Sequence, residues 1–287
     1  MENVKNILHL VRLQIKKHYL KKNCIIGFVF GGIIALKTAI CYSALVGNHT
    51  VNICEAFILN FSRKGNALTL LIGALIVFAD APFIDSGSFS VIHRIGRKKW
   101  YLTNWLYIIG ISLCYYIWVL IISMLPFCLK GYPENRWSQF MLRIMKTYTK
   151  DMDRYEIFPP DITLADISPI RSTCFTFILV VLYTVFLVSI MYTLNMLIHK
   201  KAYGTISVAV IHALAVLMDA QDVFLPVFLK KYGIFHNAFF PIGYNLDISS
   251  TGFSVMYFVI LIYIVFIIGE TLLPNTEFVL ESGIDNE

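Results

Sequence analysis

Four ionisable side chains lie within or at the edges of otherwise apolar segments: Lys37, Asp80, His212 and Glu270. Ionisable groups inside a membrane are costly, so each is a candidate for ion binding or proton transfer. Competing interpretations exist for all of them. Asp80 and Glu270 suit a hydrated position at the inner interface, and Lys37 either extends outward or faces a polar cavity. His212 more often represents a hydrogen-bonded structural histidine than a proton relay.

The rest of the sequence offers no catalytic constellation. It contains no GxxxxGK[ST] phosphate loop, no HExxH, no GxSxG and no Cys/His spacing typical of a metal site. We therefore expect no catalytic residue, no metal ligand and no cofactor-binding residue on this chain. Any energy from ATP must come from a partner.

The composition defines the kind of scaffold that must hold these residues. Of 287 residues, 57% are hydrophobic and 15% are charged, and the mean hydropathy is +0.69. Ordinary soluble domains carry about a quarter charged residues. This composition excludes a disordered chain, a coiled coil, a disulfide scaffold and a nucleic-acid-binding protein. It predicts an all-α membrane protein, because the apolar runs lack the alternation of barrel strands.

A membrane-crossing helix needs about 20 mostly apolar residues. Six segments meet or approach this length, and the second and fifth are the shortest. The predicted transmembrane helices comprise residues 24–45, 67–84, 105–129, 173–197, 204–220 and 253–273. Together they form a six-span domain over residues 24–273, followed by a tail over residues 274–287.

The basic residues predict how the chain is oriented. Lysines and arginines cluster before the first span, between spans two and three, and after span four. Positive charge favours the cytoplasmic side. Both termini of this multi-pass protein are therefore expected in the cytoplasm.

Three further segments are apolar on one side only, or too short to cross a bilayer. Residues 1–23 predict an amphipathic helix lying in the membrane interface. The loop after span three carries a helical apolar stripe from Trp137 to Tyr148, expected as a structural lid or a substrate gate on the outer face. Residues 223–232 and 234–242 are broken by Pro226, Gly233 and Pro241, and they predict a re-entrant or interfacial outer element.

The connection between spans two and three is the most informative stretch. It reads DSGSFSVIHRIGRKKWYLTN, with a polar start, a short helix that places Phe89, Ile92 and Ile95 at helical spacing, and a basic run leading into span three. One interpretation is a positive anchor on the cytoplasmic side without a partner. The other is a helix that inserts its apolar residues into a groove on a partner.

In this connection the chain resembles the membrane permease subunits of ABC-2 type exporters. That family combines an interfacial helix before span one, a cytoplasmic coupling helix between spans two and three, and a re-entrant element before span six. The resemblance implies docking to an ABC ATPase subunit, which would bind the ATP, and pairing with a second copy or a homologous permease. It also implies export across a bacterial plasma membrane. The residues that it assigns to ATPase coupling are Asp85, Gly87, Phe89, Ile92, Arg94, Ile95, Gly96, Arg97 and Lys98.

Alternatives from other classes remain open. An ion- or proton-coupled secondary transporter would use Asp80 or Glu270, although the chain shows no inverted repeat. A membrane-embedded enzyme is disfavoured by the missing catalytic residues. A membrane immunity or scaffold protein without transport activity is the third alternative.

Overall fold

The computed structural model describes most of the chain and is about 82% helical. The described residues are 2–83, 88–147, 150–198, 201–220, 233–242 and 248–273. The predicted tail over residues 274–287 lies outside them.

Four of the described helices are long and apolar enough to cross a membrane. They are α2 (Lys22–Val46), α6 (Arg97–Met124), α9 (Pro169–Ile198) and α13 (Ile248–Leu272). At 1.5 Å per residue, the 30 residues of α9 extend for about 45 Å, whereas a bilayer core is about 30 Å thick. The longest helices therefore exceed the hydrocarbon thickness.

Two shorter helices occupy the positions of the second and fifth predicted spans. These are α4 (Lys64–Val77) and α10 (Lys201–Ala220), and their apolar helical lengths fall below that of a full span. The backbone of Arg63 is extended (φ −105°, ψ 125°), which separates α4 from the short helix α3 (Glu55–Ser62). The expectation that the second helix continues to residue 84 is wrong. It ends at Val77 because turns follow and Pro82 disfavours helix in the residue before it.

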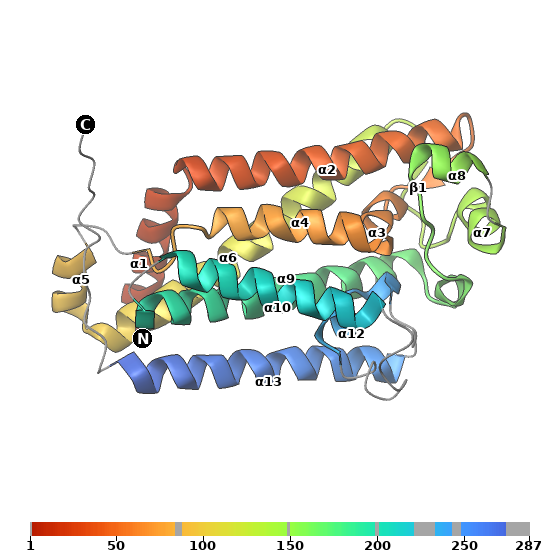
Figure 1. Cartoon of the computed structure of the whole chain (residues 1–287). Coiled ribbons are helices and arrows are strands. Elements are labelled where there is room, and N and C mark those ends of the chain that lie inside the picture. The colour runs from red at the N-terminus through yellow and green to blue at the C-terminus, as the bar shows by residue number, and fades with distance from the viewer. Residues whose placement is uncertain are drawn as a thin grey trace, which may run out of the picture.

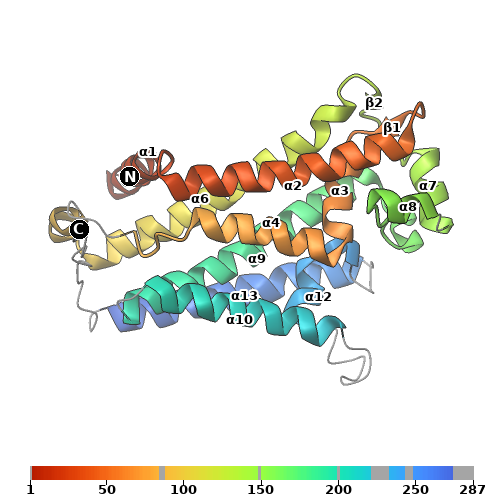
Figure 2. The same ribbon diagram turned by 45° about the horizontal axis from the view of Figure 1, so that its top comes forward.

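Figures 1 and 2 show the six apolar helices running side by side along one direction. α2 packs against α4 and α6, while α9 packs against α6, α10 and α13. Of the four candidate spans, α9 is the most enclosed, with 67% of its most apolar stretch buried, against 17% for α13. α9 is thus the central helix of the described bundle.

The outer faces of the bundle are apolar. On α13, the side chains of Met256, Ile260, Tyr263 and Ile267 are exposed at helical spacing. α2 presents a comparable stripe that includes Ile33. Continuous exposed apolar surface of this kind is unstable in water. It supports the prediction of an all-α membrane protein.

The two ends of the bundle differ in structure (Figure 1). At the end that we call basal lie α1 (Glu2–His18) and α5 (Ser88–Ile95). The opposite end, called apical, carries α3 and most of the irregular structure. Its other elements are β1 (Val51–Asn52), η1 (Leu125–Phe127), β2 (Gly131–Tyr132), α7 (Gln139–Lys146), α8 (Lys150–Tyr155), η2 (Ile162–Asp166), α12 (Ile234–Ala238) and η3 (Phe240–Ile242).

The apical end joins segments that are far apart in the sequence. β1 and β2 pair in parallel, with Val51 opposite Gly131 and Asn52 opposite Tyr132. α7 falls within the stretch predicted as helical, and the hydroxyl of Ser138 caps it by accepting a hydrogen bond from the amide of Met141 (3.0 Å). The first half of the predicted re-entrant element, residues 223–232, lies outside the described residues. Its second half forms α12 and η3, which pack against α9.

Glycine allows a close contact between α2 and α4. A Cβ atom on Gly27 of α2 would lie 2.7 Å from the carbonyl oxygen of Gly73 on α4. Only a residue without a side chain fits there. The small-residue face of the first span, formed by Gly27 and Gly31, therefore serves packing within the bundle.

Candidate functional site

The stretch for which the sequence predicts a short helix forms α5 at the basal end. Ser88 and Ile92 are buried, and Phe89 and Ile95 are half-buried. α5 packs against α6, and Ile92 belongs to the core of the chain itself. The apolar side of α5 is therefore directed mainly toward its own bundle and only partly available to a partner. Asp85 and Gly87, which precede it, lie outside the described residues.

The other side of α5 is basic and exposed. His93 and Arg94 are exposed in its last turn, and Arg97 and Lys98 are exposed in the first turn of α6. Gly96 separates the two helices with φ of 82°, a backbone conformation that favours glycine. This glycine lets the chain turn sharply while keeping the basic side chains on one end of the molecule.

A small depression lies beside this basic surface. It has a volume of about 110 Å³ between α1, α5 and α6, and its lining includes Leu10, Leu13, Val91 and Trp100. Leu13 is exposed. The basal end thus combines an apolar depression with surrounding positive charge. This combination suits docking of an acidic surface that carries an apolar side chain.

Lys37 lies on the outside of α2 and is paired. Its Nζ lies 2.8 Å from Oε2 of Glu156, which follows α8, and Nη1 of Arg63 lies 3.4 Å from the same oxygen. The guanidinium of Arg63 also stacks over Phe158, 4.8 Å from the ring centre. Lys37 therefore connects α2 to the apical end.

Asp80 and Glu270 both lie near the basal end in ion pairs. Asp80 accepts a hydrogen bond from Nδ2 of Asn23 (2.8 Å), and its carboxylate is 3.6 Å from Nζ of Lys21. Glu270 lies 3.2 Å from Nζ of Lys98. Both carboxylates are partly exposed. This placement agrees with the interpretation that they are interfacial and hydrated.

His212 is the only one of the four intramembrane candidates that is buried in the bundle. Its Nδ1 lies 2.5 Å from the hydroxyl of Tyr183 on α9, and its ring contacts Phe235 of α12. Lys37, Asp80 and Glu270 do not approach it, so the described residues form no chain of ionisable groups through the bundle. This arrangement supports a structural role for His212.

Glu55 at the start of α3 was not recognised from the sequence. Its side chain is 0% exposed and accepts hydrogen bonds from the hydroxyl of Tyr42 (2.7 Å), the amide of Ser138 (2.7 Å) and the hydroxyl of Ser138 (2.9 Å). Burial raises the pKa of Glu55, and the hydrogen bonds oppose that rise. The available signal was a single carboxylate within the apolar stretch VNICEAFIL.

Glu156, the acceptor for Lys37 and Arg63, was not recognised from the sequence either. The hydrogen bond and positive charge of Lys37, together with the charge of Arg63, lower the pKa of Glu156. Among the described residues, no group of three or more His, Cys, Asp or Glu side chains is arranged to hold a metal ion.

Three comparisons with known proteins find no relative of this chain. A scan of protein-family models, a search of curated proteins and a search of solved structures each return no match.

Proposed function

We propose that this chain is the permease subunit of an ATP-driven ABC exporter, coupling a separate ATPase subunit to export across the plasma membrane. The observation that carries the proposal is α5, a short helix linking two apolar helices and fixed to the bundle through Ile92. Its exposed side presents Arg94 beside the basic start of α6. A motor protein could dock there and move the bundle.

A coupling helix must transmit movement, and polar contacts support such a path. Oδ1 of Asn104 on α6 accepts a hydrogen bond from Nε2 of Gln14 on α1 (3.1 Å). Nδ2 of Asn104 donates to the hydroxyl of Tyr192 on the central helix α9 (3.2 Å). Because α5 packs against α6, we expect a displacement of α5 to reach α1 and α9 through these contacts. Closure of two ATPase subunits upon ATP binding would shift the bundle between inward- and outward-facing states.

The remaining parts of the proposal follow from charge and from the resemblance. Positive charge at the basal end favours a cytoplasmic position for α1 and α5. A second copy or homologous permease would complete the pathway. The bacterial location and the export direction derive from the resemblance.

A coupled secondary transporter needs a carboxylate within the bundle. In the described part of the chain, Asp80 and Glu270 instead form ion pairs near the basal end. No observation favours this alternative specifically. An immunity or scaffold protein without transport would share the fold and differ in lacking a bound ATPase.

Purification from the native host tests the proposal. The C-terminally tagged chain is isolated in mild detergent, its partners are identified by mass spectrometry, and ATP hydrolysis is measured. We expect a stoichiometric ATPase carrying a phosphate loop. Arg94→Glu should reduce its retention about tenfold or more, because charge reversal at a docking surface adds repulsion to lost attraction.

Arg143→Glu is the matched control, since Arg143 is exposed on α7 at the opposite end. This variant should retain the ATPase at the wild-type level. A chain that purifies without an ATPase, under conditions that preserve a reference ABC complex, contradicts the proposal. Equal losses in both variants would also contradict docking at α5.

A further inference from the structure

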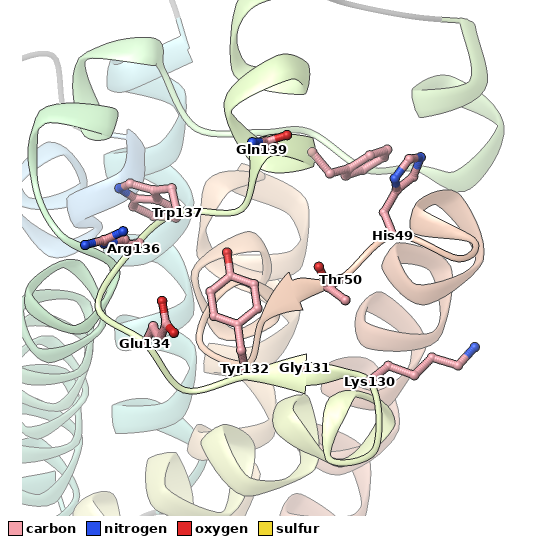
Figure 3. Close-up of a pocket in the computed structure, with 10 residues that line it drawn as sticks. His49, Thr50, Lys130, Gly131, Tyr132, Glu134, Arg136, Trp137 and Gln139 are labelled. Atoms are coloured by element: carbon pink, nitrogen blue, oxygen red, sulfur yellow. The ribbon is translucent and has the colours of Figure 1, made fainter.

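A cavity lies at the apical end (Figure 3), opposite the basal end that carries α5 (Figure 1). Its volume is about 650 Å³, within the range of about 300–1,000 Å³ typical of small-molecule sites. The walls come from the turn after α2, from β2 and the loop that follows it, and from the start of α7. Tyr132 stands in the middle, with its hydroxyl directed into the space between the loop and the turn that carries Thr50.

The backbone around the cavity is held firmly. Nδ2 of Asn52 donates hydrogen bonds to the carbonyl oxygens of Glu134 and Arg136, and the amide of Ile53 donates to the carbonyl of Tyr132 (3.3 Å). Nε1 of Trp137 donates to the carbonyl of Ile167 (2.6 Å). The loop therefore presents its side chains from a preorganised frame, which reduces the entropy cost of binding.

The polar side chains on this frame are available to a ligand. Those of Glu134, Arg136 and Gln139 are exposed, and within the described part of the chain none of the three forms a hydrogen bond or ion pair. Their fixed backbone and unused hydrogen-bonding groups distinguish them from the paired charges at Lys37 and Asp80.

The chemistry of the lining defines the class of ligand. A guanidinium such as that of Arg136 binds a carboxylate through two parallel hydrogen bonds, and Lys130 adds a second positive charge to the rim. The carboxylate of Glu134, two residues from Arg136, can accept hydrogen bonds from N–H groups. Its negative charge repels multiply charged anions such as phosphate monoesters. Tyr132 and Phe140, the latter stacked on His49 with ring centres 5.7 Å apart, supply aromatic surface.

We propose that this cavity binds the C-terminal end of a peptide. The terminal carboxylate pairs with Arg136, a backbone N–H or basic side chain faces Glu134, and an apolar side chain rests on Tyr132 and Phe140. Peptides combine these three kinds of group within a few atoms. The proposal is independent of ATPase docking, because the cavity and α5 lie at opposite ends of the bundle.

Two synthetic tetrapeptide mixtures with the same randomised sequences test this site. One mixture ends in a free carboxylate and the other in a carboxamide. The full-length chain is immobilised in mild detergent, and the retained peptides are quantified by mass spectrometry. We expect the free-acid mixture to be retained about tenfold more strongly, a typical effect of one charge-assisted pair.

Arg136→Gln should abolish this preference, whereas Arg143→Gln on the exposed side of α7 should preserve it. Glu134→Gln should reduce the enrichment of peptides that carry lysine or arginine. Within the described part of the chain the exposed Arg136 side chain forms no hydrogen bond or ion pair, so its variant should keep the wild-type thermal unfolding midpoint. Equal retention of acids and amides, retention of neither, or an unchanged preference in Arg136→Gln overturns the proposal.

Discussion

At the scale of single residues, Glu55 shows how one buried carboxylate organises the apical end. It joins Tyr42 of α2 to Ser138 at the cap of α7, positions separated by almost a hundred residues. A buried acceptor with three donors is stabilising only while every partner is present. Ser138→Ala should therefore weaken the attachment of α7, with a loss of about 1–3 kcal/mol.

The raised pKa of Glu55 predicts a pH dependence with a definite sign. Burial favours the neutral acid in the folded state, so the folded chain binds the proton more tightly than the unfolded chain. This contribution to stability is complete below the ordinary pKa of 4.5 and is lost as pH rises through the folded pKa. Glu55→Gln should flatten the decline in thermal unfolding midpoint above pH of about 4.5.

Glu134→Gln is the matched control for the pH experiment, because Glu134 is an exposed carboxylate at the same apical end. Its thermal unfolding profile should follow that of the wild type. If Glu55→Gln kept the full decline while Glu134→Gln removed it, the burial of Glu55 would not be the cause.

At the scale of elements, helix packing depends on the glycines of α2 and α4. Gly27→Leu should destabilise the protein, because the new side chain would meet the backbone of Gly73 and the side chain of Val77. Overpacking of this kind costs about 1–3 kcal/mol. The thermal unfolding midpoint in detergent measures the effect.

Gly110→Leu on α6 provides the comparison, since nothing lies within 4 Å of a Cβ atom at that position. It should leave the midpoint close to that of the wild type. A similar loss in both variants would indicate a general effect of replacing helical glycine, and the close contact between α2 and α4 would not explain it.

The helices show which features the sequence could predict. Long apolar runs correctly located α2, α6, α9 and α13, because a run of that length has few alternatives in a chain this poor in charge. The early end of α4 was missed, since the turns after Val77 are still apolar. Hydrophobicity identifies the segment and does not define where the helix stops.

The candidate sites divide in the same way. The local sequence predicted the position and the positive charge of α5. It did not predict that the apolar side of α5 packs mainly against its own bundle. The apical contacts depend on residues distant in sequence, such as Asn52 with Glu134 and Glu55 with Ser138. Such pairings are decided by tertiary packing, and no local pattern encodes them.

At the scale of the whole molecule, the proposed orientation can be tested by chemical labelling. In a background without native cysteines, Gln139→Cys at the apical end should react in intact cells with a thiol reagent that cannot cross membranes. His93→Cys on α5 should react only after the cells are opened. Both positions are exposed, so the membrane is the only intended barrier. Labelling of His93→Cys in intact cells would contradict the proposed orientation and place the basal end outside the cytoplasm.

The Glu55 contact also has an evolutionary consequence. The side chains of Tyr42, Glu55 and Ser138 are buried and hydrogen-bonded to one another, whereas those of Glu134, Arg136 and Gln139 at the cavity are exposed. Residues around the cavity can then be substituted during evolution without repacking the helices, provided that Glu55 keeps its hydrogen-bond donors. Divergence among related chains should accordingly concentrate at positions such as Glu134, Arg136 and Gln139, while Tyr42, Glu55 and Ser138 change together or not at all.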